Sequence, residues 1–202
     1  MGAAGLGRAD ERGRKMVSKI SPGHPLRRLF GGLVEQVFMI EMGICDTRLT
    51  DYLSAMLGDF VHIDAIFRLH TVDGEVIREV SRVEAEAYLG PEVDGTLRTR
   101  LINHYIGDFT LFWTGVYPES LRRRRAGVDR LREYLLQGSR SYGIASELSG
   151  EQAEPPAGLL RKLSDEFESC VHGLHLVRDG WQRLDPTLRQ GGWASTGEAG
   201  AG

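Results

Sequence analysis

His104 and Asp108 lie four residues apart in the segment RLINHYIGDFTLFW (100–113), and an imidazole beside a carboxylate can move protons. If the segment is helical, the two side chains lie one turn apart at the edge of an aromatic face, partly shielded from water. Such a pair can act as a general base or supply two metal ligands. The simpler interpretation, which we favour from sequence alone, is a structural His–Asp hydrogen bond at a helix contact.

Asp64 is a second acid on an apolar helical face. On the wheel of a helix over residues 50–69 it falls between Leu53 and Leu57. A buried acid needs a partner, and we expect an arginine from another helix. If Asp64 instead converged with His104 and Asp108, a small polar cavity inside the protein would result.

Glu168, His172 and His175 follow at spacings of four and three residues, and these residue types can bind zinc. The helical wheel places Glu168 and His172 on the side opposite the core, with His175 near the boundary. Exposed ligands on one straight helix bind metals weakly without a second element to close the site. We therefore predict no metal site here and keep the three residues as candidates only.

Motifs that would identify a common enzyme class do not occur. The sequence contains no G-x-x-x-x-G-K-[ST] phosphate loop, no H-E-x-x-H zinc motif and no G-x-S-x-G hydrolase motif. Cys45 and Cys170 are far apart and lack a C-x-x-C partner, so we expect both to be small buried apolar residues. We predict no cofactor, and whether the protein is an enzyme stays open.

The segment GDFTLFWTGVYPESLRRRR (107–125) joins aromatic residues to four arginines. Helical spacing makes the aromatics a core face, with Gly115 as a left-handed helix C-cap and Pro118 at the start of the next helix. Arg122–Arg125 fan around that helix, which favours a solvated, ion-paired surface over phosphate binding. A net charge of −3 and a pI near 6.1 also make nucleic acid an unexpected partner.

The stretch GDFTLFWTGVYPE (107–119) resembles one found in uncharacterised bacterial helical proteins. The similarity covers most of the expected folded part of the chain. It implies an all-α fold and a bacterial origin. It carries no known activity and therefore supplies no catalytic residues.

Helical periodicity dominates the rest of the chain. The spacing predicts an all-α, single-domain bundle of six or seven helices, and short connections favour antiparallel neighbours. Residues 68–80 are ambiguous, because Asp73-Gly74 also suits a hairpin. The expected helices cover residues 26–42, 50–69, 75–89, 96–114, 118–137, 139–148 and 158–179.

The 202 residues are 41% hydrophobic and 26% charged, typical of a soluble globular protein. We expect a helical domain over residues 24–184 between disordered tails at 1–23 and 185–202. No apolar run is long enough to span a bilayer, and the N-terminus lacks the apolar core of a secretory signal, so we expect a cytoplasmic protein without membrane contact.

Two functions follow as hypotheses. Rich helical patterning without a catalytic motif favours a non-catalytic protein-interaction or self-associating module, with a protein partner or a homo-oligomer. The alternative is a helical bundle that binds a small molecule or metal around His104 and Asp108, with Trp113 or Tyr117 nearby. The second function would allow catalysis.

Overall fold

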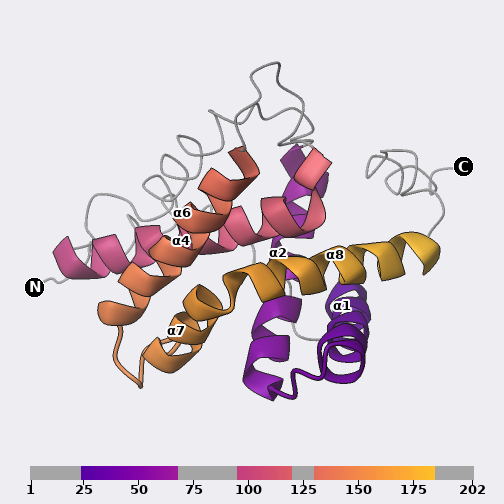
Figure 1. The fold of residues 1–202 in the computed structure, drawn as a ribbon, viewed down its shortest axis with the longest axis horizontal. Helices are drawn as coiled ribbons and strands as arrows, with labels where there is room; N and C mark the ends of the chain where they lie inside the picture. Colours follow the sequence, from indigo (N-terminus) through magenta and orange to yellow (C-terminus); the bar gives the residue numbers. More distant parts are fainter. Residues whose placement is uncertain (1–23, 68–94, 120–129, 185–202) are drawn as a thin grey trace, which may run out of the picture.

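The computed structural model describes residues 24–67, 95–119 and 130–184, and these residues form an all-helical body (Figure 1). The all-α prediction is confirmed. The predicted tails, the helix or hairpin within residues 68–89, and the arginine run 122–125 lie outside the described residues. The described helices are α1 (Pro25–Glu35), the π-helix η1 (Gln36–Glu41), α2 (Thr47–Phe67), α4 (Gly95–Val116), α6 (Arg130–Glu147), α7 (Ala157–Asp165) and α8 (Phe167–Leu184).

The first predicted helix is present, and its local signals explain its ends. Pro25 occupies the first turn, where a missing N–H costs nothing, and His24 Nδ1 accepts a hydrogen bond from the Leu26 amide at 3.2 Å. The last turn widens into η1. Gly43, at φ 71°, then takes the left-handed conformation that few other residues adopt easily. The sequence-predicted end of this helix is therefore confirmed.

Asp46 begins α2 and also links it to α7. Its Oδ1 accepts a hydrogen bond from the Leu49 amide at 3.1 Å, as expected for an N-cap residue. Its Oδ2 accepts a second from Lys162 Nζ at 2.8 Å. The Lys162 hydrogen bond is the main reason why the pKa of Asp46 is lowered. Both side chains remain about 30% exposed, so the pair stabilises the fold only modestly.

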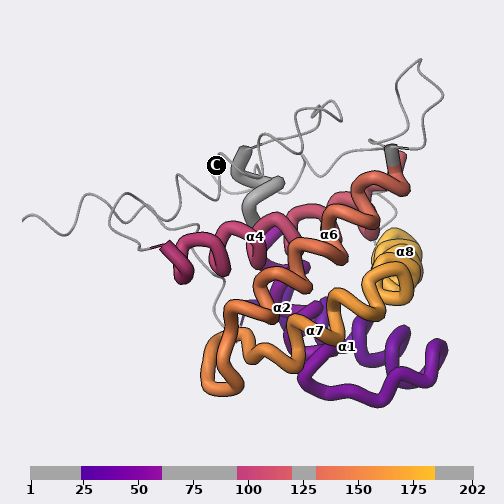
Figure 2. Tube along the Cα trace, turned by 60° about the vertical axis from the view of Figure 1, so that its left-hand side comes forward, coloured from indigo at the N-terminus to yellow at the C-terminus, as the bar shows by residue number. Residues whose placement is uncertain are grey.

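The helix α8 lies between two other groups of helices. It contacts α1 on one side and α4 and α6 on the other, and α7 leads into it from below in Figure 1. The tube view shows α4 and α6 side by side, with α8 to their right and α1 below α8 (Figure 2). The most extensive helix pairing is that of α4 with α6. The residues that could form a site on α4 are thus held from several directions.

The helix α4 is buried on more than the aromatic face that the sequence predicts. Phe109 and Phe112 are buried, as predicted, but Thr110 and Thr114 are buried too. Packing by α2, α6 and α8 around α4 explains this result. The Thr114 hydroxyl donates to the Thr110 carbonyl at 2.7 Å, which satisfies it without a partner from another helix.

Gly115 is not the left-handed cap that the sequence predicts. The helix continues through it to Val116, and Gly43 is the glycine with positive φ among the residues that the structure describes. A Cβ at Gly115 would lie 2.7 Å from the Leu174 Cβ of α8. This glycine therefore permits close helix packing instead of ending the helix.

Two predicted helix boundaries are wrong. Gly138 does not interrupt α6, which continues through it, and a Cβ added there would clash with the Phe167 ring. The predicted helix 158–179 breaks at Glu166, where the backbone leaves helical geometry between α7 and α8. Hydrophobic spacing continues through this break and so does not reveal it.

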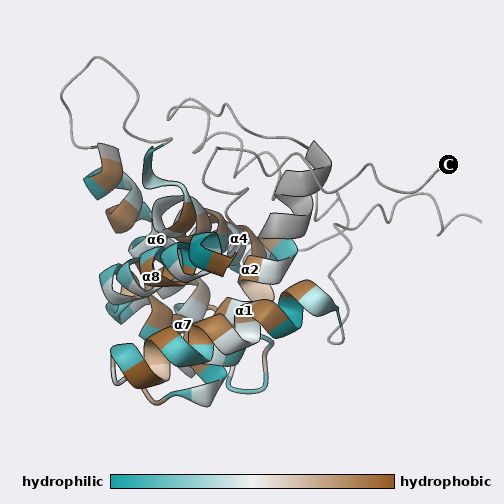
Figure 3. Ribbon diagram, turned by 90° about the vertical axis from the view of Figure 1, so that its right-hand side faces the viewer, coloured by the Kyte–Doolittle hydropathy of each residue, from teal (hydrophilic) through white to brown (hydrophobic). Residues whose placement is uncertain are grey.

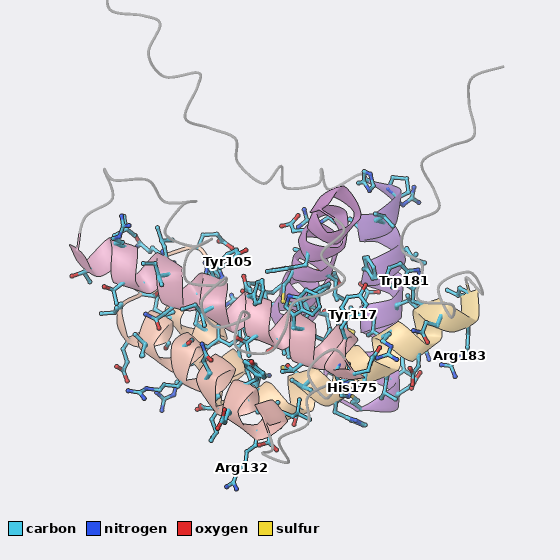
Figure 4. The ribbon with its side chains drawn as sticks, turned by 90° about the horizontal axis from the view of Figure 1, so that it is seen from above. Tyr105, Tyr117, Arg132, His175, Trp181 and Arg183 are labelled. Carbon is cyan, nitrogen blue, oxygen red and sulfur yellow. The ribbon has the colours of Figure 1, made fainter. Side chains whose placement is uncertain are left out.

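Most large apolar side chains of the described residues are buried in the core. In Figure 3, α1 and α7 carry hydrophobic residues along one side and hydrophilic residues along the other. Figure 4 shows Arg132 and Arg183 pointing away from the body, while Trp181 lies on the side of α1, where it packs edge-on against Phe30. Cys170 is buried, as predicted, whereas the prediction for Cys45 is wrong because it is exposed. None of the described helices has the length and apolar character that crossing a membrane requires.

Candidate functional site

The predicted pairing of His104 and Asp108 is present in α4. His104 Nε2 lies 3.3 Å from Asp108 Oδ2, one helical turn away. The side chains are 21% and 15% exposed, respectively, so both are largely withdrawn from water. The pair is therefore neither a surface ion pair nor a fully buried one.

Two tyrosines from other helices complete a cluster around this pair. Tyr52 of α2 places its Oη 2.8 Å from His104 Nε2 and also donates a short hydrogen bond to Asp108 Oδ1. Tyr142 of α6 donates to the same Oδ1 at 2.6 Å. We call Tyr52, His104, Asp108 and Tyr142 the polar cluster.

Three helices position the polar cluster. Gly107 faces α6, and the Tyr142 ring packs so closely on it that an added Cβ would lie 2.7 Å from ring carbons. This contact lets the Tyr142 hydroxyl reach the next residue, Asp108. Leu53, fully buried beside Tyr52, fixes α2 against the core. The cluster is therefore a product of helix packing and not of α4 alone.

Loss of contact with water raises the pKa of both tyrosines well above 10.0. The negative charge of Asp108 raises the pKa of each further, since it opposes a second negative charge nearby. Both phenols thus keep their protons at neutral pH. They act as hydrogen-bond donors to the carboxylate.

A pocket of about 780 Å³ opens beside the polar cluster, and Tyr52, His104 and Asp108 line it. Apolar side chains from α2 and α4, among them Phe60 and Leu101, form part of its wall. The connection between α6 and α7 supplies another part of the wall, residues 151–156. Its volume falls within the range of about 300–1,000 Å³ that is usual for small-molecule sites.

Arg100 of α4 holds this part of the wall in place. Its Nε donates to Ser149 Oγ at 2.6 Å, and its Nη2 donates to the carbonyls of Glu154 at 3.0 Å and Pro155 at 3.3 Å. Arg100 is only 7% exposed, so these polar partners compensate for lost hydration. One buried guanidinium therefore connects the helix of His104 and Asp108 to the α6–α7 connection that lines the pocket.

Other predicted neighbours of the site lie elsewhere. Asp64 belongs to the last turns of α2, but its side chain lies outside the described residues, so its convergence with His104 stays a prediction. Trp113 and Tyr117 do not line the pocket. They pack on each other and on Phe112, with ring centroids 5.4–6.0 Å apart.

The three candidate metal ligands on α8 do not form a joint site. Glu168 and His172 are exposed, as predicted, while His175 is partly buried with its Nε2 2.9 Å from the Thr114 carbonyl oxygen. Burial lowers the pKa of His175. No group of three or more His, Cys, Asp or Glu residues that could hold a metal ion occurs within the described ranges 24–67, 95–119 and 130–184.

His104 and Asp108, half of the polar cluster, were predictable from the sequence, whereas Tyr52, Tyr142 and Arg100 were not. Their partners on α4 or in the α6–α7 connection are 34 to 56 residues away along the chain. Helical spacing carries no information about such pairings. The one local signal was Gly107, a glycine inside an apolar helix, which often marks a close contact.

Comparisons with protein-family models, with curated proteins and with solved structures gave no match to this chain. The resemblance of residues 107–119 to uncharacterised bacterial helical proteins stays a prediction.

Proposed function

We propose that this chain is a helical bundle that binds a small organic molecule in the pocket between α2, α4 and residues 151–156. The observation that carries the proposal is that the polar cluster opens onto a ligand-sized cavity. A purely structural His–Asp pair satisfies its polar groups within protein and needs no adjoining space. Here Tyr52, His104 and Asp108 line the cavity and offer polar atoms at its wall.

The composition of the pocket wall suggests the kind of ligand. Met56, Phe60 and Leu101 supply apolar surface, and Tyr105 adds an aromatic ring. Charged side chains also line the pocket: Arg27, Arg48, Asp51, Asp59, Glu151 and Glu154. Sites of this kind bind an apolar body through its surface and orient it through a few polar contacts. We therefore expect a ligand with a compact apolar or aromatic part and one polar group that reaches His104.

Blocking the pocket tests the proposal. Ala55 lines the cavity, so the variant Ala55→Trp fills it with an indole ring. Leu136→Trp is a matched control, because Leu136 is 62% exposed on α6 and does not line the pocket. Both variants are compared with the unmodified chain by backbone amide NMR during titration with aromatic alcohols, amines and ethers.

We expect at least one compound class to shift the amide signals of residues 52, 101 and 104 in the unmodified chain and in Leu136→Trp. The shifts should disappear in Ala55→Trp. Shifts that persist in Ala55→Trp, or no shift with any class, would contradict a binding function for this pocket.

Protein contact or self-association, the function favoured by the sequence, has weaker support. Ile40, Leu97, Leu136 and Leu184 are large apolar side chains that are at least half exposed. They lie on four different elements, η1, α4, α6 and α8, and single exposed apolar residues are normal on protein surfaces. Light scattering at several concentrations separates the two ideas, because self-association predicts a mass that rises with concentration.

A further inference from the structure

The hydrogen bonds of the polar cluster determine where its protons are. Asp108 Oδ1 faces two phenols, Tyr52 and Tyr142, and each phenol has a single proton. An ionised carboxylate oxygen accepts both bonds, and the two phenols retain their protons at neutral pH. The Tyr52 hydroxyl therefore donates its only proton to Asp108.

The hydrogen bond from Tyr52 to Asp108 determines the tautomer of His104. Its Nε2 lies 2.8 Å from Tyr52 Oη, whose only proton points to the carboxylate. Two lone pairs cannot form a hydrogen bond, so Nε2 must carry a proton and donate it to Tyr52. Asp108 Oδ2 lies 3.3 Å from the same nitrogen, and its negative charge further favours a proton on Nε2. In the neutral ring Nδ1 then bears the lone pair.

The lone pair of Nδ1 is available for a ligand. His104 lines the pocket, and its Nδ1 forms no hydrogen bond with the part of the chain that the structure describes. The contacts of Tyr52 and Asp108 hold the opposite edge of the ring. A ring held on one nitrogen and open on the other is the arrangement of a general base.

We propose that His104 accepts a proton or hydrogen bond through Nδ1 from an O–H or N–H group of the bound ligand. The inference rests on the proposed function and names the ligand class as a hydrogen-bond donor with an apolar body. If the proton transfers to Nδ1, the electron pair of the broken O–H or N–H bond stays on the ligand atom. The His104 ring then carries a proton on each nitrogen. Asp108 then stabilises the imidazolium, as a carboxylate partner does for a base histidine. Asp108 and Tyr52 are positioning residues in this scheme.

The tautomer is tested first, in the full chain without ligand. Long-range ¹H–¹⁵N NMR distinguishes a protonated from an unprotonated ring nitrogen. We expect the neutral His104 ring to carry its proton on Nε2. A proton on Nδ1 would overturn the proposal, whatever binds in the pocket.

The ligand class is tested with phenol and anisole as probes. The two molecules share an aromatic ring, but anisole has a methyl group where phenol has its hydroxyl proton. We expect phenol to bind at least about tenfold more tightly, corresponding to about 1.4 kcal/mol, and to shift the ¹⁵N signal of His104 Nδ1. In His104→Phe, which keeps a ring of similar size, the preference for phenol should disappear.

The outcomes separate the two proposals. Equal binding of phenol and anisole would overturn the donor requirement and leave the binding function standing. A phenol preference that survives in His104→Phe would assign the contact to another residue and overturn the role of His104. Failure of both probes, together with failure of the wider compound set, would contradict the binding function and this inference alike.

Discussion

At the scale of single residues, Asp108 is the centre of the site. It accepts hydrogen bonds from Tyr52 and Tyr142 and lies beside His104, so residues from α2, α4 and α6 depend on its charge. The sequence finds Asp108 and His104 because helical spacing places them together. It does not find the tyrosines, because their positions are set by contacts between helices that are distant along the chain.

Replacing Asp108 with Asn should therefore change both stability and the state of His104. The amide has one oxygen for two phenols and a donor group that would face the His104 N–H. We expect a loss of about 1–3 kcal/mol in the free energy of unfolding and a shift of the His104 proton to Nδ1. Urea unfolding and ring ¹⁵N NMR measure the two effects.

Asp165→Asn is the matched control. Asp165 is 60% exposed and pairs with Arg161 at 3.3 Å, so its loss should change stability by no more than about 1 kcal/mol. Equal effects of the two substitutions would contradict a central role for Asp108.

At the scale of elements, the site depends on how closely α4 approaches α6. Gly107 permits that approach, and the Tyr142 ring occupies the space of the missing side chain. Burial of Phe109 and Phe112 was predictable from spacing, but the direction from which each helix packs was not. The same limit explains why Gly115 and Gly138 looked like helix ends, although both accommodate side chains of neighbouring helices.

Gly107→Ala should push Tyr142 away from Asp108. The new methyl group would lie within 3 Å of the ring, and overpacking of this kind costs about 1–3 kcal/mol. Gly32→Ala is the control, since an added Cβ there meets nothing within 4 Å and alanine favours helix. We expect thermal unfolding to show a lower midpoint for the first variant and an equal or higher midpoint for the second. The opposite order would refute the close-packing explanation.

Arg100→Met should loosen the part of the pocket wall formed by residues 151–156, while keeping an unbranched apolar side chain. The Glu154 and Pro155 carbonyls and the Ser149 hydroxyl would lose their donor, at a cost of about 1–3 kcal/mol. We expect faster hydrogen exchange at the Ala153 amide, which bonds to Gly150 within this connection. Unchanged exchange there would show that Arg100 does not hold the wall.

At the scale of the whole molecule, α8 fastens the end of α4. His175 contacts the Thr114 carbonyl, and Arg178 Nη1 bonds to the Val116 carbonyl at 3.0 Å and to Glu119 at 2.9 Å. Carbonyls at a helix C-terminus lack partners within the helix, so donors from α8 stabilise them. The fold class was predictable from hydrophobic periodicity. The hydrogen bonds from α8 to the end of α4 and the break at Glu166 were not, because they depend on packing between helices.

The burial of His175 makes global stability depend on pH. Burial, the Thr114 contact and the nearby charges of Arg178, His172 and Asp179 act on His175, and burial lowers its pKa below 6.5. The unfolded chain then binds more protons than the folded one below about pH 6.5, so this contribution is present above that pH and is lost as the pH falls. We expect urea unfolding midpoints to fall from about pH 7.5 to about pH 5, and to fall less in His175→Gln. An identical pH dependence in the variant would exclude His175 as a source.

The most direct test of the account is a crystal structure of the full chain soaked in phenol. The account predicts a phenol ring in the pocket between α2, α4 and residues 151–156, with its hydroxyl within hydrogen-bond distance of His104 Nδ1 and both tyrosines on Asp108. A pocket filled by the protein's own side chains, or Tyr52 and Tyr142 turned away from Asp108, would contradict it.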